Sequence, residues 1–202
     1  MLYRPSSVQS SSSSAAGLDF YLLGPPRVEW EGHALPLSRR QVRALLFRLA
    51  AETHPLPREQ LCYLFWPDVP EATARRNLTG LLAHIRRTLP IPDILVTQDD
   101  HVGLDPDHFW VDTSAFAQRV AVQGPLVPFP SLQEAVDLYR GPFLDGFSLP
   151  KNPELESWIT LERQKHERLY LEALAALMDW KTTTGEYDDA IAHGRHYLST
   201  DA

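Results

Sequence analysis

The chain has little cysteine and no long hydrophobic run. Its 202 residues include one cysteine, Cys62, which excludes an internal disulfide and a cysteine-rich zinc site. No apolar stretch approaches the ~20 residues of a membrane span, and the N-terminus lacks the charged and apolar regions of a secretory signal. We therefore expect a cytoplasmic protein with no membrane partner, in which Cys62 is a small buried hydrophobe.

Motifs for catalysis, metal binding and cofactor binding are also missing. The sequence has no Gly-rich phosphate loop, no nucleophile elbow and no paired acid motif. His193 and His196 are three residues apart, but no carboxylate or cysteine completes a metal-ligand set. The acids between residues 99 and 107 lack the spacing of a calcium-binding loop. We expect a protein that is not an enzyme and that has no metal and no cofactor.

The formal net charge of −7 is unevenly distributed. Residues 1–122 contain 12 arginines and 13 acids, whereas residues 123–202 contain 7 bases and 13 acids. In the first part the arginines form two clusters, at residues 39–48 and 75–87. Because a local basic surface is enough to attract phosphate, the overall acidic balance does not exclude a nucleic-acid partner.

The first half alternates between short strand patterns and helix patterns. Residues 1–17 are Ser-rich, and we expect them to be a disordered tail. Three strand patterns interrupted by Gly and Pro then predict a small antiparallel sheet over residues 18–37. We expect Ser38 to cap a helix whose apolar stripe ends before His54-Pro55. That stripe consists of Val42, Leu45, Leu46 and Leu49.

Two further helices and a hairpin follow. Residues 58–66 and 71–89 have helical patterns, and residues 94–106 predict two short strands around Gln98-Asp99-Asp100. Three helices, with a short turn between the last two and a hairpin after them, predict a winged helix-turn-helix. In this fold the last helix enters the major groove of DNA.

The helix at residues 71–89 has the pattern of a groove-reading helix. One face is an apolar stripe of Leu78, Leu81, Leu82, Ile85 and Leu89. The opposite face carries the residues that we predict to contact base edges or to line the groove: Arg76, Thr79, Gly80, Ala83 and Arg87. Arginine has the donor fork that binds guanine or phosphate, and small residues permit close approach. The alternative is an ordinary amphipathic helix with a solvated basic face.

Residues 18–120 resemble the OmpR-type winged helix of the SARP family, the Streptomyces antibiotic regulatory protein type of activator. The matching segments are LLG with EGHALPL, RRQVRALLFRLA, PREQLCYLFWPDVPEATARRNL, HIRRTL and VDTSAF. Family members usually carry a Gly-Tyr pair in the second wing strand, where this chain has His101-Val102-Gly103-Leu104.

The second half resembles the bacterial transcriptional activator domain. Its opening is SLQEAVDLYRGPFLDGF, followed by a long helical pattern from about Pro153 to Trp180. Residues 184–190 resemble the turn of a tetratricopeptide repeat. We therefore expect residues 18–122 to form the winged helix and residues 123–202 the start of an all-α, tetratricopeptide-like domain. Because solenoids need several repeats, we expect a fragment of a longer regulator; the alternative is an unusually short activator.

Further contacts are predicted around the reading helix. The residues that we expect to contact phosphate are Arg75, Arg86, Arg39, Arg40 and Arg43. Gln98 and His101 belong to the wing. The resemblance implies an RNA polymerase contact at the turn from Trp66 to Thr73, through Trp66, Asp68 and Glu71, and a homodimer on direct repeats.

The sequence thus predicts a mainly α fold with a small antiparallel sheet. Its predicted function is sequence-specific binding of double-stranded DNA by a transcriptional activator that recruits RNA polymerase. A protein-interaction adaptor with a degenerate winged helix and a partner-binding helical half is the alternative. A hydrolase with an unrecognised site is a weaker third hypothesis.

Overall fold

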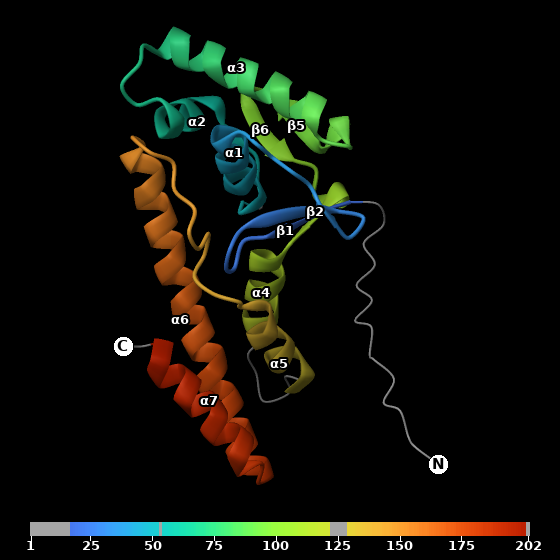
Figure 1. The fold of residues 1–202 in the computed structure, drawn as a ribbon, viewed down its shortest axis with the longest axis vertical. Coiled ribbons are helices and arrows are strands. Elements are labelled where there is room, and N and C mark those ends of the chain that lie inside the picture. The colour runs from blue at the N-terminus through green and yellow to red at the C-terminus, as the bar shows by residue number, and fades with distance from the viewer. Residues whose placement is uncertain (1–16, 53, 122–128, 201–202) are drawn as a thin grey trace.

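The computed structural model describes residues 17–52, 54–121 and 129–200 (Figure 1). The expected N-terminal tail, apart from Gly17, lies outside the described residues. The mainly α fold class is confirmed, and so are the winged-helix elements within it.

A mixed four-stranded sheet opens the fold. It consists of β1 (Leu18–Tyr21), β2 (Arg27–Trp30), β3 (His33–Ala34) and β7 (Phe109–Val111), in the order β3-β2-β1-β7. The first three strands are antiparallel, as predicted. The prediction missed β7, which pairs parallel to β1 with Leu18 opposite Phe109. Leu18 and Phe20 are fully buried because alternate residues of β1 face the core.

Three helices pack beside this sheet. They are α1 (Arg40–Ala50), α2 (Arg58–Phe65) and α3 (Glu71–Thr88). The predicted apolar stripe of α1 is buried, and so is Cys62 in α2. The prediction that Ser38 caps α1 was wrong. The N-cap is Arg39, with φ −83° and ψ 121°, and no side chain accepts a hydrogen bond there.

The predicted hairpin is confirmed as the wing. It consists of β5 (Leu95–Gln98) and β6 (His101–Leu104), and β4 (Leu56–Pro57) adds to β6 as a third antiparallel strand. A Cβ at Gly103 would lie 3.1 Å from the Pro55 Cα. Glycine therefore allows the chain before β4 to approach β6 closely.

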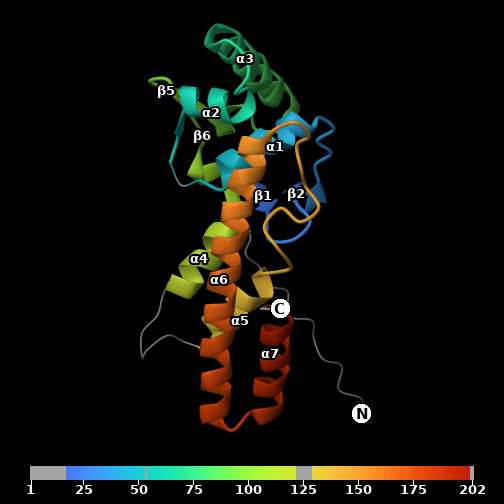
Figure 2. The same ribbon diagram turned by 90° about the vertical axis from the view of Figure 1, so that its left-hand side faces the viewer.

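Four described helices follow the wing and β7. They are α4 (Asp112–Ala121), α5 (Phe129–Leu138), α6 (Pro153–Thr184) and α7 (Tyr187–Thr200). Helices α6 and α7 run antiparallel (Figure 2). Gly185 ends α6 with φ 81°, a left-handed conformation that glycine adopts without strain. The predicted turn between two helices is therefore confirmed. None of the described helices is long and apolar enough to cross a membrane.

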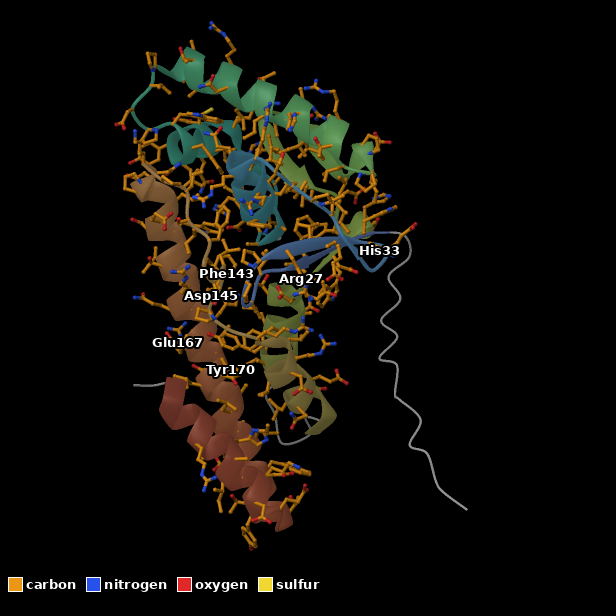
Figure 3. The ribbon with its side chains drawn as sticks, viewed as in Figure 1. Arg27, His33, Phe143, Asp145, Glu167 and Tyr170 are labelled. Atoms are coloured by element: carbon orange, nitrogen blue, oxygen red, sulfur yellow. The ribbon has the colours of Figure 1, made fainter. Side chains whose placement is uncertain are left out.

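The two halves share their hydrophobic cores. The segment between α5 and α6 returns to the sheet and α1, and its apolar side chains join those of α1–α3 in one cluster. Phe143 contacts Trp158 of α6 edge to face at 5.5 Å, and Phe147 contacts Phe47 of α1 at 5.3 Å. Figure 3 shows Phe143 between α6 and the sheet, and Tyr170 farther along α6 toward α5. Helix α6 thus packs against the winged helix and against α4 and α5.

Candidate DNA-binding surface

Helix α3 lies across one end of the molecule, with its outer face uncovered (Figure 1). Its predicted apolar stripe is buried against α1 and α2. On the outer face Arg76, Thr79, Gly80 and Arg87 are exposed, and Ala83 is half-buried. The structure therefore places all five predicted groove residues on one helix, with four of them open to solvent.

Residues from α3 and from the start of α1 line a shallow hollow at this surface. Its volume is about 490 Å³, and its lining residues are Arg39, Gln41, Trp66, Arg76, Asn77, Gly80 and Leu81. Arg39, which precedes α1, and Arg76 of α3 thus line the same hollow. The N-terminal end of a helix carries a partial positive charge. The positive end of α1 and two guanidinium groups therefore lie at this hollow.

Sequence reasoning missed Asn77 and Gln41 in this hollow. Both are exposed, and carboxamide side chains are suited to bidentate bonds with adenine. The available signal for Asn77 was its low helix propensity in the middle of a strong helix pattern. Gln41 carried no such signal, because only the packing of α1 against α3 places it here.

Gly80 has no structural partner that requires a glycine. A Cβ built at this position would meet no heavy atom within 4 Å. Glycine inside a helix costs about 1 kcal/mol relative to alanine. The residue therefore leaves the backbone of α3 accessible at a cost in stability that packing does not explain.

The predicted phosphate-contacting arginines fall into two groups. Arg39 and Arg40 are exposed and, among the described residues, have no ion pair, as is also true of Arg76 and Arg87. Arg86 instead holds the wing, because its Nη2 donates hydrogen bonds to the Thr97 Oγ1 at 3.1 Å and to the Leu95 carbonyl at 3.4 Å.

Arg43 and Arg75 also have partners within the protein. The Arg43 guanidinium lies 5.6 Å from the ring centroid of Phe147, in a separate hollow with Val28 and Phe47. The Arg75 Nε donates to a Glu71 oxygen at 2.9 Å, and its Nη1 donates to both Asp100 oxygens, at 3.0 and 3.2 Å. These hydrogen bonds raise the pKa of Arg75 and lower the pKa of Asp100.

The wing residues and the turn before α3 are solvent-accessible. Gln98 and His101 are exposed and pair across the hairpin. Asp68 is exposed, whereas Trp66 is half-buried and packs against the core. Glu71 is exposed but paired with Arg75. No group of three or more His, Cys, Asp or Glu within the described ranges could hold a metal ion.

The start of α6 is attached to the end of α2, next to this turn. The buried Asn152 side chain accepts a hydrogen bond from the Leu155 N–H at 3.0 Å and so caps α6. Its amide nitrogen donates a long hydrogen bond of 3.5 Å to the Phe65 carbonyl. The Asn152 side chain therefore connects the start of α6 to the end of α2.

Comparisons with known proteins agree with the expected resemblance. Residues 128–201 match the family model described as the bacterial transcriptional activator domain. The fold is similar to that of "Mycobacterium tuberculosis EmbR in complex with low affinity phosphopeptide", with a TM-score of 0.56 and 19% sequence identity, covering 91% of this chain and 59% of that chain. Comparison with curated proteins returns no match. The predicted resemblance to SARP-type regulators, with a winged helix before an activator domain, is confirmed.

Proposed function

We propose that this SARP-like transcriptional regulator binds double-stranded DNA sequence-specifically, with α3 as the reading helix. The single observation that supports this most strongly is the outer face of α3. Arg76 and Arg87 there have no ion pair among the described residues, and the backbone at Gly80 is open between them. The two arginines are 11 positions apart, about 17 Å along the helix axis. A free cation at each end of an accessible backbone suits a helix in the major groove.

We assign different tasks to the cations of this surface. Arg76 and Arg87, with Thr79 and Ala83, would contact base edges or the groove. Arg39 and Arg40, at the start of α1, would contact phosphate and orient the protein on the duplex. Gln98 and His101 of the wing remain candidates for a contact with the adjacent DNA backbone.

We further propose activation by contact with RNA polymerase at the turn between α2 and α3. Asp68 is exposed in this turn. Trp66, two residues earlier, packs against the core and so anchors the turn to it. The side-by-side homodimer on direct repeats remains a prediction from the resemblance.

Selection of bound sequences from a random duplex pool tests DNA binding and identifies the site. On a selected duplex we expect Arg76→Ala to weaken binding by about 1–3 kcal/mol and to relax specificity. Arg168→Ala is the matched control, because it removes an exposed arginine from α6, away from α3. Equal losses by Arg76→Ala on selected and random duplexes would contradict base reading by Arg76.

The adaptor hypothesis predicts a different result. A winged helix that no longer binds DNA would retain no duplex in gel-shift titrations at either of two salt concentrations. Retention that falls steeply with salt is the outcome we expect from phosphate contacts.

A further inference from the structure

The turn of the wing places one carboxylate between two arginines. Both oxygens of Asp100 accept hydrogen bonds from the Arg75 Nη1, at 3.0 and 3.2 Å. The Oδ1 also lies 3.8 Å from the Arg58 Nε of α2. Glu71 also contacts the Arg75 Nε at 2.9 Å. The carboxylates of Glu71 and Asp100 and the guanidinium groups of Arg58 and Arg75 thus form a cluster without net charge at the start of α3.

The backbone holds Asp100 in this position. The Arg58 N–H donates a 2.8 Å hydrogen bond to the Asp100 carbonyl, which attaches the turn to the start of α2. Asp99 and Asp100 have φ values of 45° and 64°, the left-handed conformation of two-residue hairpin turns that Asp and Asn tolerate. The carboxylate of Asp100 is therefore directed at Arg75 by a turn that the pairing of Gln98 with His101 and the Arg58 N–H hold in place.

The neighbouring Asp99 differs only in its partners. It lies in the same turn, has the same left-handed conformation and is exposed. Among the described residues its carboxylate forms no ion pair, whereas Asp100 is paired with Arg75. Substitution of Asp99 removes only a negative charge near DNA, whereas substitution of Asp100 also removes the ion pair with Arg75.

Arg75 lies next to Arg76, so a free Arg75 would be close to DNA phosphates. Its Nε and Nη1 can bind phosphate only if they give up the hydrogen bonds to Glu71 and Asp100, and among the described residues only its Nη2 forms no hydrogen bond. The hydrogen bonds from Arg75 also lower the pKa of Asp100, so its carboxyl group stays charged. DNA phosphate therefore competes with Asp100 for the Arg75 Nη1 and for the positive charge that the two carboxylates balance.

We propose that Asp100 is a positioning residue that holds Arg75 against the wing and withholds it from DNA phosphate. This inference rests on the proposed DNA binding, and it replaces the phosphate contact predicted for Arg75. With Arg75 occupied, one fewer cation binds any duplex regardless of sequence. The affinity for random DNA is therefore lowered. On the specific site, a larger share of the binding free energy comes from Arg76 and the other groove residues.

The test compares Asp100→Asn with Asp99→Asn in the full chain, on a mixed-sequence duplex over a series of salt concentrations. Both variants replace one carboxylate with an amide in the same turn, where asparagine is tolerated. We expect Asp100→Asn to raise the affinity several-fold and to steepen the dependence of log K on log salt by about one, since one more phosphate is neutralised. Asp99→Asn should leave the slope unchanged.

Substitution of Arg75 completes the test. In the wild-type background Arg75→Gln should not change the slope, and in the Asp100→Asn background it should remove the gain. Equal slope changes for the two aspartate variants, or a slope lowered by about one in Arg75→Gln alone, would overturn the inference but leave the proposed function intact. Failure of the wild-type protein to retain duplex would instead contradict the proposed function and this inference together.

Discussion

Gly80 is the residue at which stability and function are expected to oppose each other. Because a Cβ here meets open space, Gly80→Ala should raise the free energy of unfolding by about 1 kcal/mol. The same methyl group would stand between α3 and a base pair, so binding to the selected duplex should weaken. Chemical denaturation and gel-shift titration of the same variant measure both effects. A variant with unchanged affinity would contradict close approach at Gly80.

Asp112 makes the stability of the protein depend on pH. Its carboxylate accepts hydrogen bonds from the Leu22 and Leu23 N–H groups at 2.8–3.0 Å, yet burial raises its pKa from 3.8 to about 6. Asp112 therefore stays protonated to a higher pH in the folded protein than in the unfolded chain. The contribution of protonated Asp112 to stability is complete below pH 3.8 and is lost as the pH rises through 6, by about 3 kcal/mol.

Asp112→Asn tests this dependence, because an amide cannot titrate. The free energy of unfolding of the wild type minus that of the variant should fall between pH 4 and pH 7, as measured by urea denaturation. A difference that stays constant over this range would contradict the raised pKa.

At the scale of elements, α6 depends on Asn152 at its first turn. Asn152→Ala removes the cap and the hydrogen bond to the Phe65 carbonyl, and it should lower the free energy of unfolding by about 1–2 kcal/mol. Asn152→Asp retains the capping oxygen but not the donor, so it should lose less in urea denaturation. An alanine variant as stable as the wild type would contradict both roles.

The elements themselves were predictable to different degrees. Helices α1 and α3 have long apolar stripes, and the predicted stripes are buried. Strands β4 and β7, of two and three residues, were not predicted. Their pairing with β6 and β1 depends on residues far away in the sequence.

At the scale of the whole molecule, the segment after α5 completes the core of the winged helix. Phe143 and Phe147 belong to the cluster that contains α1 and α3. His166 of α6 stacks on Phe143 at 5.4 Å, and the Arg163 guanidinium donates hydrogen bonds to the Phe143 and Leu144 carbonyls. The predicted boundary at residue 122 falls between α4 and α5 and remains a prediction, but the packing crosses it.

Phe143→Ala should therefore destabilise both halves together. Loss of this fully buried ring is expected to lower the free energy of unfolding by about 3–5 kcal/mol. Tyr187→Ala, at a residue of α7 that is 62% exposed, is the control and should change it little. Thermal unfolding followed by circular dichroism measures both variants. A loss comparable to that of the control would contradict the shared core.

The sequence by itself determined the order of the main helices, the hairpin and the face of α3 that stays in solvent. Each depends on local periodicity, because the residues that form an amphipathic helix or a two-residue turn are neighbours in the chain. The arginine-bearing face of residues 71–89 was identified from that periodicity alone.

Only the tertiary structure decided which arginines of this face are free. Arg75 and Arg86 are occupied by Asp100, Glu71 and the wing strand, whereas Arg39 is brought beside Arg76 from another helix. The hydrogen bonds join residues up to 25 positions apart, and the hollow is lined by residues 37 positions apart. Local periodicity does not encode such contacts, because they arise when α1, α3 and the wing pack around a common core.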